Sequence, residues 1–492
     1  MRICRRDFGA RVLAGLAASA TRLQSLAVRP KLLVLVVIEQ FRPDYLDAAQ
    51  PQLSPGGFRR LLERGAYFPD CRHLASSFPA STLATLASGA WPAQHGIIAD
   101  TWYDRTAKKI VTATDEELLA TTLAAQVASG SRTRVAVLSL EEMHSSIFAG
   151  TPDARQYWMD KDGLFATNSD VPDWLSAFNS QRPLDALHDY HWIAVGAKPD
   201  APPLRVLTYD PKRPQEFLTL YRSSPSAMLA QFEMFSEMLK AERWGQANTF
   251  DLACLLIGST ELLGYETGAR SPLMQQMILQ IDRKLEALLA QLSKTPGERD
   301  FTLVVMGAHG APPEPLPESR ERMAVSGEAV AQLVDKSLQS AASGRVDKYL
   351  YPFLYLDTSG FRDPEPLRQA AARAAMQHPA VAAWYTAGGE CSLHNDWACR
   401  FRNSFHPVRS GDVMLSYLPE CIEDFGPDRG VSYGSLYNYD IRVPLCFYGP
   451  QFKPAIFETP VEAVDIAPTL ARAIGVAAPS SSIGRVLGEA FA

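Results

Sequence analysis

Long apolar runs alternate with segments of helical apolar spacing along most of this chain. Nearly continuous runs rich in Leu, Val and Ile occupy residues 31–38, 251–257, 301–306 and 442–448. Such runs are typical of strands that are buried on both faces of a sheet. Residues 273–292 instead carry apolar side chains three or four positions apart, at Met274, Met277, Ile278, Ile281, Leu285 and Leu288. The alternation predicts an α/β fold with a mostly parallel central sheet and helices on both faces.

Two stretches interrupt this rhythm, at about residues 148–222 and 312–407. The first is rich in Pro, Asp, Trp and Tyr without sustained periodicity, and the second includes loops around Ser343-Gly344 and Gly388-Gly389. We expect both to be cap insertions around the mouth of a site, because loops of this length usually serve binding or selection. The rest of residues 29–492 is expected to form a single α/β domain.

The first 28 residues have a different character from the rest of the chain. Arg5-Arg6 precede a weakly apolar, small-residue stretch over residues 9–20, which ends in the possible cleavage signal Ala18-Ser19-Ala20. This pattern predicts a twin-arginine-like export signal in residues 1–28 and a mature protein in the periplasm or outside the cell. A disordered basic tail is the alternative. The stretch is too short and polar to span a membrane, which needs roughly 20 apolar residues.

The charge of the chain says little about its partner. The formal net charge is −6 and no long basic run is present. This composition argues against nucleic acid and anionic lipid as partners. A small molecule or another protein of unknown identity is therefore expected.

Four short motifs stand at or near the ends of the strand-like runs. They cover residues 37–45, 258–265, 305–310 and 432–435. In open parallel sheets, ligands bind beyond the carboxyl ends of the strands. Glu39, Glu261 and His309 each follow a predicted strand at that end.

Together with Ser88-Gly89 and residues 92–97 and 464–470, these motifs resemble the alkaline phosphatase superfamily, specifically its type I phosphodiesterase/nucleotide pyrophosphatase branch. The resemblance runs from about Leu32 to Leu487 and implies an alkaline-phosphatase-like fold with a two-zinc phosphoryl-transfer site. The six positions that correspond to the family's side-chain zinc ligands are Glu39, Glu261, Tyr265, Ala308, His309 and Tyr433. Of these, only His309 is the residue that the family carries.

The substituted positions predict weak zinc binding. In the family, one zinc would use the positions of Glu261, Tyr265 and Tyr433, and a neutral phenol is a poor zinc ligand. The other would use Glu39, the nucleophile, Ala308 and His309, which leaves two or three ligands. We therefore expect no cofactor. If the site is active, we expect zinc. Tyr265 and Tyr433 are expected to converge on Glu261, and Glu39 is expected to approach His309.

The position of a nucleophile is ambiguous. Ser77-Phe78-Pro79 matches the family's Thr-x-Pro, but two extra residues then separate it from Ser88-Gly89. Alignment without a gap places Pro79 at the nucleophile position, which would abolish the chemistry. Ser77, Ser81 and Thr82 remain candidate hydroxyls, and a helix N-cap is the alternative role.

Three further positions bear on phosphate recognition. Asp100 stands where the family often has an Asn that donates to a phosphate oxygen, and an ionised carboxylate cannot donate. Glu141 and Met143 stand where a phosphomonoesterase-like branch has a Lys and an Arg. Carboxylates around one cleft would oppose a phosphoryl substrate.

These substitutions favour an exported pseudoenzyme of the superfamily that binds a ligand or partner. The alternative is a metal-dependent hydrolase of phosphoric or sulfuric esters with an unorthodox site. A purely structural role is a third possibility. Bound-metal analysis separates the first two, because hydrolysis in the family depends on zinc.

Overall fold

The computed structural model describes residues 29–75, 77–187, 189–198, 200–312, 324–340, 344–393, 396–419, 421–424 and 434–492. The expected export signal at residues 1–28 and the ligand-position residue Tyr433 lie outside the described residues.

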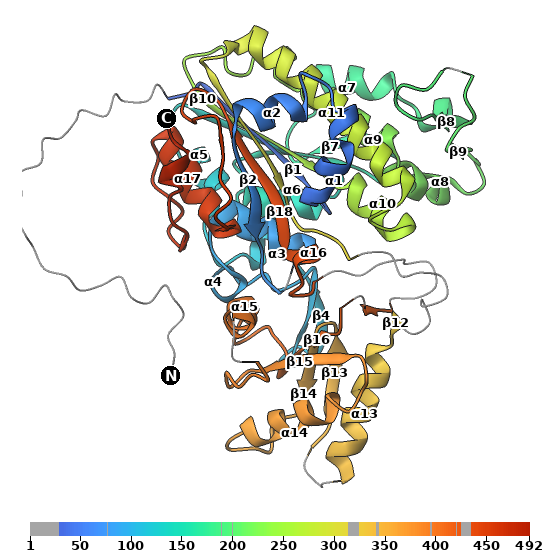
Figure 1. The fold of residues 1–492 in the computed structure, drawn as a ribbon, viewed down its shortest axis with the longest axis vertical. Helices are drawn as coiled ribbons and strands as arrows, with labels where there is room; N and C mark the ends of the chain where they lie inside the picture. The colour runs from blue at the N-terminus through green and yellow to red at the C-terminus, as the bar shows by residue number, and fades with distance from the viewer. Residues whose placement is uncertain are drawn as a thin grey trace, which may run out of the picture.

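A ten-stranded sheet forms the centre of the larger of two bodies (Figure 1). The strand order is β19-β2-β18-β11-β1-β10-β5-β6-β7, and β20 also pairs with β2. The strands are β1 (Leu32–Ile38), β2 (Ala66–Arg72), β5 (Thr133–Leu138), β6 (Arg155–Met159), β7 (Phe165–Thr167), β10 (Phe250–Ile257), β11 (Phe301–Gly307), β18 (Arg442–Tyr448), β19 (Ala455–Ile456) and β20 (Val461–Glu462). All four strand-like runs of the sequence are strands of this sheet.

The middle of the sheet is parallel. β1 lies between β10 and β11, and Ile38 at its carboxyl end is level with Ile257 on one side and Gly307 on the other. β5 continues the parallel order beyond β10, whereas β18 runs antiparallel to both β11 and β2. The mostly parallel sheet predicted from sequence is confirmed. The residues that follow β1, β10 and β11 consequently meet at one edge.

Helices cover both faces of this sheet. Alternate residues of β1 enter two different cores, with Val34 and Val36 in one and Leu33 and Leu35 in the other. The first face is covered by α1 (Pro43–Ala49), α2 (Phe58–Arg64), α7 (Asp173–Ser180), α8 (Pro214–Arg222), α9 (Pro225–Ala241), α10 (Ser259–Thr267) and α11 (Pro272–Leu292). The second is covered by α3 (Pro79–Ser88), α5 (Leu123–Ala128), α6 (Glu142–Ala149) and α17 (Ile466–Ile474). The periodic segment 273–292 is thus the helix α11, as its spacing predicts.

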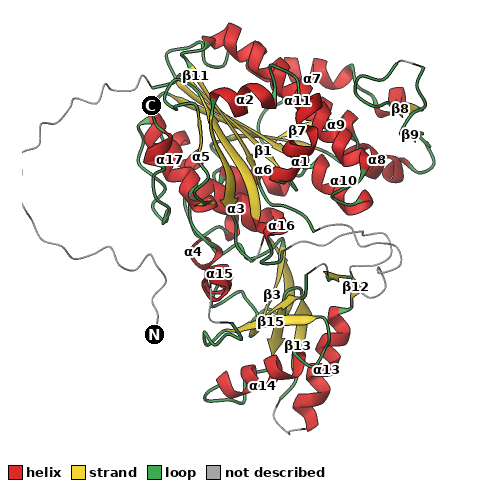
Figure 2. Ribbon diagram, viewed as in Figure 1, coloured by secondary structure: helices red, strands yellow, loops and turns green. Residues whose placement is uncertain are grey.

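The smaller body is built on a second, antiparallel sheet, seen at the bottom of Figure 2. Its order is β13-β14-β16-β15, comprising β13 (Val346–Leu350), β14 (Phe353–Leu356), β15 (Val381–Thr386) and β16 (Val413–Tyr417). Helices α13 (Gly327–Ser340) and α14 (Glu365–Ala375) pack on it and share its core. Most of this body falls in the expected insertion 312–407, although β16 lies beyond it. The other expected insertion, 148–222, contributes β6 and β7 to the main sheet before forming α7, α8 and the hairpin of β8 (Tyr190–Trp192) and β9 (Arg205–Leu207).

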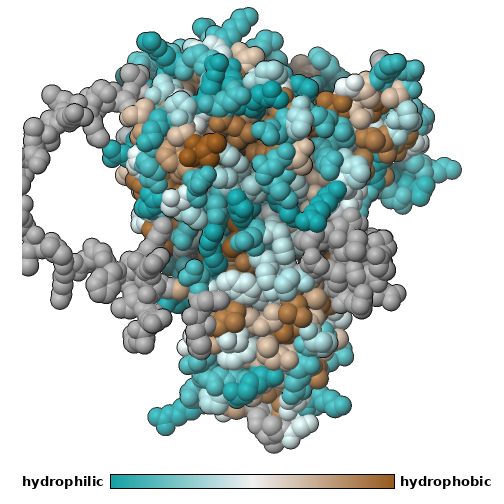
Figure 3. Space-filling view, in the orientation of Figure 1, coloured by the Kyte–Doolittle hydropathy of each residue, from teal (hydrophilic) through white to brown (hydrophobic). Residues whose placement is uncertain are grey.

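Short elements surround the junction of the two bodies. They are α4 (Pro92–His95), β3 (Thr101–Asp104), β4 (Lys109–Thr112), β12 (Ala324–Val325), α15 (Asp396–Ser404), β17 (Ile422–Glu423) and α16 (Asn438–Ile441). Figure 3 shows hydrophilic side chains over most of the visible face of both bodies, with hydrophobic areas between them. Within the described ranges, no helix combines the length and apolar character that a membrane crossing needs.

Candidate functional site

The carboxyl ends of three neighbouring strands bring together Glu39, Glu261 and His309, which we call the strand-end cluster. One ligand atom from each residue lies within 4.8 Å of the others. Their relative exposures are 0%, 6% and 0%, so the cluster is shielded from water. Glu39 and His309 therefore lie close together, as the ligand-position alignment anticipated, and Glu261 lies with them.

Backbone hydrogen bonds hold the segments that carry the cluster. The Glu39 N–H donates to Ile257 O at 3.0 Å, and the Phe41 N–H donates to His309 O at 2.9 Å. The Thr260 hydroxyl donates to the Glu39 carbonyl at 2.5 Å. The turns after β1, β10 and β11 are thus tied to one another, which fixes the positions of their side chains.

His144, in α6, is a fourth member of the site that motif reasoning missed. Its Nδ1 lies 3.1 Å from Oε1 of Glu39, and its side chain is 7% exposed. The resemblance drew attention to Glu141 and Met143 in the same segment, but not to the next residue. A histidine in the first turn of a helix that follows a parallel strand was the available signal, because such helices begin at the ligand-binding edge.

Burial raises the pKa of Glu39 to about 7. The neighbouring Glu261 side chain opposes this rise, whereas the negative charges of Asp100 and Glu141 add to it. Neither carboxylate oxygen of Glu39 has a hydrogen bond of ordinary geometry among the described residues. His144 and Glu39 are therefore close enough to form an ion pair, but their atoms are not aligned for a hydrogen bond. A buried carboxylate in this state costs several kcal/mol.

His309 is held as a neutral imidazole. Burial lowers its pKa to about 4, the hydrogen bond to Gly310 opposes this, and the electrostatic effect of the nearby His144 adds to it. Its Nδ1 lies 2.8 Å from Gly310 O, so Nδ1 carries the proton and donates to that carbonyl. The lone pair of the neutral ring is consequently on Nε2.

Asp100 occupies the amino end of α3. Its Oδ1 accepts a hydrogen bond from the Ala80 N–H at 2.9 Å. Burial raises the pKa of Asp100 to about 6, the Ala80 hydrogen bond opposes this, and the negative charge of Glu261 adds to it. Exposed amides at a helix start attract phosphate and other anions. Here a carboxylate of the protein itself takes that position.

The candidate hydroxyls at the start of α3 differ in their partners. Ser81 and Thr82 both donate to the Phe78 carbonyl at 3.0 Å. Ser77 is fully buried, and its Oγ has no hydrogen-bond partner in the part of the chain that the structure describes. Pro79 is the first residue of α3. Of the three candidates, Ser77 is therefore the one whose hydroxyl makes no hydrogen bond to the backbone of the helix start.

The two positions expected to replace phosphate-binding cations lie at the start of α6. Glu141 forms an ion pair with Arg222 of α8, with Nη1 and Oε1 2.9 Å apart. Arg222 also donates to the Leu140 carbonyl at 2.8 Å. Met143 is partly buried and packs against the core between the two bodies. Arg222 thus supplies a cation that sequence reasoning did not identify, but Glu141 neutralises it.

Aromatic side chains line the side of the site that faces the smaller body. Tyr265 and Tyr351 pack against the cluster of Phe78 and Ala99. The rings of Phe78 and Tyr351 are 6.0 Å apart in an edge-to-face arrangement. Tyr265 is accordingly placed beside Phe78, and the expected convergence with Tyr433 falls outside the described residues.

The described residues do not fit a pair of zinc ions. Ala308 is a fully buried core residue whose N–H donates to Ile38 O at 2.9 Å, and it offers no ligand atom. Tyr265 offers only a phenol. Glu39, Glu261 and His309 remain, and they converge on one point instead of two. Two tetrahedral zinc sites would need about four ligands each.

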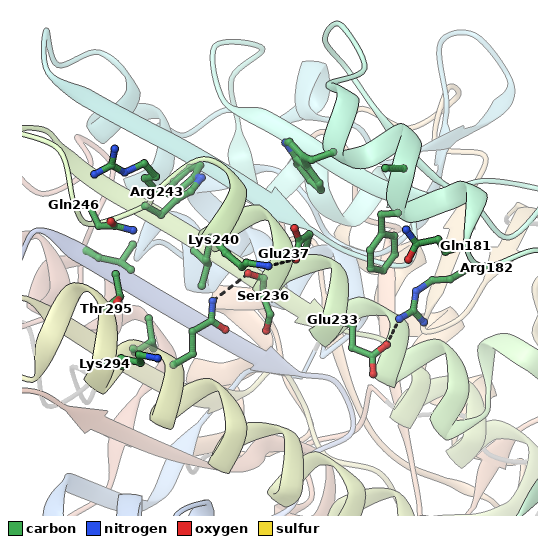
Figure 4. A pocket seen from close by; sticks show the side chains of 18 residues that line it. Gln181, Arg182, Glu233, Ser236, Glu237, Lys240, Arg243, Gln246, Lys294 and Thr295 are labelled. Atoms are coloured by element: carbon green, nitrogen blue, oxygen red, sulfur yellow. Dashed lines mark hydrogen bonds and ion pairs between the residues drawn. The ribbon is translucent and has the colours of Figure 1, made fainter.

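A cavity of about 890 Å³ lies at the opposite end of the sheet (Figure 4). Its wall includes Leu32, the first residue of β1, together with side chains of α7, α9 and α11. Lys240 and Glu237 form an ion pair there at 3.5 Å, and Gln291 donates to Ser236 O at 3.0 Å. The strand-end cluster is not among its lining residues, so cavity size does not point to the candidate site.

Comparisons with known proteins find that the chain is similar to phosphatases and phosphodiesterases. Alkaline phosphatase PhoV from Synechococcus elongatus is 24% identical over 94% of this chain and 93% of its own length. Alkaline phosphatase PafA from Elizabethkingia meningoseptica is 23% identical over 94% of each chain. The crystal structure of wild-type PafA matches the fold with a TM-score of 0.79 at 19% identity, covering 94% of this chain and 99% of that chain. Murine ectonucleotide pyrophosphatase/phosphodiesterase 5 matches with a TM-score of 0.57 at 14% identity, covering 94% of this chain and 100% of that chain.

A family model described as type I phosphodiesterase/nucleotide pyrophosphatase matches residues 33–325. This range includes β10, β11 and all of β1 except Leu32, and it contains all of the strand-end cluster. The chain belongs to the type I phosphodiesterase/nucleotide pyrophosphatase family, within the alkaline phosphatase superfamily.

Proposed function

We propose that this chain is an exported pseudoenzyme of its family, which has lost two-zinc phosphoryl transfer and binds a ligand or a protein partner. The observation that carries the proposal is the hydrogen bond from the Ala80 N–H to the Asp100 carboxylate. It fills the anion-binding start of α3 with a negative charge. A phosphoryl group at that place would meet repulsion where catalysis needs positive charge or hydrogen-bond donors.

The surrounding groups support the same proposal. Glu39 and Glu261 lie close by, and the negative charges of Glu261 and Asp100 raise the pKa values of their neighbours. The hydroxyls of Ser81 and Thr82 are engaged within α3. Arg222 is paired with Glu141. This arrangement can accept protons or cations, and it offers little to a phosphate oxygen.

The test is turnover of aryl phosphate monoesters, aryl phosphate diesters and aryl sulfates by the purified mature protein with added zinc. We expect rates equal to those of a Ser77→Ala variant and of buffer. Ser77→Ala is the matched control because its hydroxyl is the uncommitted candidate nucleophile. Turnover by the wild type that disappears in Ser77→Ala would overturn the pseudoenzyme proposal.

One observation favours a second candidate function, a metal-dependent hydrolase of phosphoric or sulfuric esters with an unorthodox site. Ser77 Oγ is buried without a hydrogen-bond partner among the described residues. Such a hydroxyl normally costs free energy, and a nucleophile is one reason to retain it. Loss of turnover in Ser77→Ala, with retention in Thr82→Val, would establish this function.

Export is the second part of the proposal and rests on Arg5-Arg6 and the apolar segment that follows. Cell fractionation of the full chain should recover a shortened product in the periplasm or the medium. Replacing both arginines by lysine should leave the precursor in the cytoplasm. Normal processing of the doubly substituted protein would contradict the twin-arginine assignment.

A further inference from the structure

A cavity at the amino end of the main sheet is lined by aromatic rings and cations. It measures about 890 Å³, and its wall comes from α7, α9 and α11 together with Leu32 at the start of β1. The strand-end cluster is not part of this wall. We propose that this amino-end cavity binds a small organic anion that carries an aromatic ring, such as an aryl carboxylate or an aryl sulfonate.

Two aromatic rings of α7 face the cavity. Trp174 and Phe178 are both partly buried and lie four residues apart, a spacing that places side chains on one face of a helix. The Trp174 Nε1–H donates to Glu242 Oε1 at 3.0 Å, and the buried Trp244 donates to Oε2 of the same carboxylate at 3.2 Å. One carboxylate therefore fixes both indoles. Rings held in this way lose little entropy when a ligand stacks on them.

The wall carries four cationic side chains and two carboxylates. Arg182 pairs with Glu233, and Lys240 lies 3.5 Å from Glu237. These pairs use both carboxylates. The other two cations of the wall are Arg243 and Lys294.

Arg243 and Lys294 are exposed, and neither forms an ion pair with a carboxylate among the described residues. They follow the carboxyl ends of α9 and α11, each of which carries about half a negative charge. The two unpaired cations exceed this dipole charge. The cavity is therefore positive in a chain whose formal net charge is −6.

The two unpaired cations belong to segments that touch. A Cβ on Gly245 would lie 2.8 Å from Pro296 Cγ and 3.1 Å from Leu32 Cβ. The turn after α9 thus lies directly against the segment after α11. Figure 4 shows Arg243 and Lys294 at the same end of the cavity. An anion at this end can contact both.

These features together select the class of ligand. Aromatic side chains favour a planar ring, which gains from stacked or edge-to-face contact. Arginine and lysine favour a carboxylate, sulfonate or phosphate group. The volume is in the range of small-molecule sites, which measure about 300–1,000 Å³. A metal ion would be repelled by the excess positive charge.

The experiment is calorimetric titration of the full mature chain with naphthalene-2-sulfonate and with 2-naphthoate. We expect saturable binding of at least one of these probes, with one equivalent per chain and a raised melting temperature. Two further compounds separate the parts of the ligand. The neutral ring of 2-naphthol and the ringless anion methanesulfonate should each bind at least about tenfold more weakly, since each lacks one set of contacts.

Variants of the wall locate the binding. The double variant Arg243→Gln/Lys294→Gln should weaken it by at least about tenfold, because each ion pair with an exposed cation contributes up to about fivefold. Trp174→Leu should weaken it by about threefold to tenfold. The matched control is Lys336→Gln/Arg373→Gln, which removes the same two charges from exposed positions of α13 and α14. This control should bind as the wild type does.

Circular dichroism shows whether each variant is folded, and the exposed cation variants keep the test valid if Trp174→Leu is not. Three results would overturn the proposal: no saturable binding of either probe, equal affinity for 2-naphthol, or unchanged affinity in the folded Arg243→Gln/Lys294→Gln protein. Neither probe contains an ester bond. The result is therefore independent of whether the chain hydrolyses esters, which turnover assays measure separately.

Discussion

At the scale of single residues, buried hydroxyls on and beside α3 differ in how their hydrogen bonds are satisfied. Thr85 Oγ1 donates to Ser81 O at 2.8 Å and lies 3.0 Å from His95 Nε2. His95 Nδ1 accepts from the Ile97 N–H, so its Nε2 must donate to Thr85. Ser77 Oγ has no such partner among the described residues. Leaving a buried polar group unmatched costs more than a formed hydrogen bond gains.

The first prediction compares these two hydroxyls. Ser77→Ala removes an unmatched group, so the free energy of unfolding should stay constant or rise by up to about 1 kcal/mol. Thr85→Val leaves the Nε2–H of His95 without an acceptor. This substitution should lower the free energy of unfolding by about 1–3 kcal/mol. Urea unfolding followed by fluorescence measures both. A large loss of stability in Ser77→Ala would show that its hydroxyl has a partner in solution.

A second residue-scale feature is a buried carboxyl in the smaller body. Glu423 Oε2 accepts from the hydroxyls of Tyr349 and Tyr417, at 2.7 Å each. Its Oε1 accepts from the Gly327 N–H at 3.2 Å. Burial nevertheless raises the pKa of Glu423 from 4.5 to about 7. Desolvation of the charge therefore outweighs three hydrogen bonds.

The second prediction follows from this raised pKa. Below pH 4.5 the carboxyl is protonated in both the folded and the unfolded state. Between pH 4.5 and about 7 the unfolded state loses its proton first, so stability falls as pH rises, by up to about 3 kcal/mol in total. Glu423→Gln lacks this titration. Urea unfolding of both proteins from pH 5 to 8 should give diverging stabilities, and parallel curves would contradict the assignment.

At the scale of elements, the turn after β1 lies directly against α10. Gln40 adopts a positive φ of 49° and is fully buried. A Cβ on Gly264 would lie 1.8 Å from Gln40 Oε1. The glycine in the middle of α10 therefore allows the helix to approach the turn that carries Glu39.

The third prediction tests this close approach. Gly264→Ala should lower the free energy of unfolding by about 1–3 kcal/mol through overpacking, despite the better helix propensity of alanine. Gln40→Gly removes the obstructing side chain and suits the positive φ. In the Gln40→Gly background, Gly264→Ala should lower the free energy of unfolding only slightly. A double-mutant cycle measures how much smaller this loss is than in the wild-type background. Additive effects would show that the two residues do not touch.

The elements also show what sequence could and could not predict. Apolar runs identified β1, β10, β11 and β18, because burial of both strand faces leaves a direct trace in composition. The antiparallel direction of β18 leaves no such trace, since an apolar run reads the same in either direction. Glu39, Glu261 and His309 stood out because each follows its strand. His144 did not, because its place depends on how α6 packs on α3 and β5.

At the scale of the whole molecule, a buried aspartate links the smaller body to the β3–β4 hairpin at the junction of the two bodies. Asp412 is 1% exposed and pairs with Arg105, between β3 and β4, at 2.5 Å. It also pairs with Arg368 of α14 at 2.9 Å and accepts from the Leu356 N–H at 2.8 Å. Arg105 lies in the turn between β3 and β4, so this pair connects the smaller sheet to the hairpin that follows α3 and α4 in the chain.

The fourth prediction concerns this junction. Asp412→Ala leaves two arginines without their carboxylate and should lower the free energy of unfolding by about 2–4 kcal/mol. The loss should be smaller than for a fully buried ion pair, because Arg105 is about one-third exposed. Hydrogen exchange should accelerate first in β13, β14 and β16. Asp357→Ala breaks an exposed pair with Arg345 and should change exchange little. Equal effects of the two variants would contradict a special role for Asp412.

The strand order has a further consequence for how the chain reaches its native state. β1 is made first, but its neighbours β10 and β11 come much later in the sequence. Pairing across such separations is slow, because a long loop must close before the contacts form. Until residue 307 has been synthesised, β1 lacks its neighbour β11, and an apolar strand with an unpaired edge is prone to aggregate. Fragments that end before β11 should therefore depend on chaperones, whereas the complete chain should not.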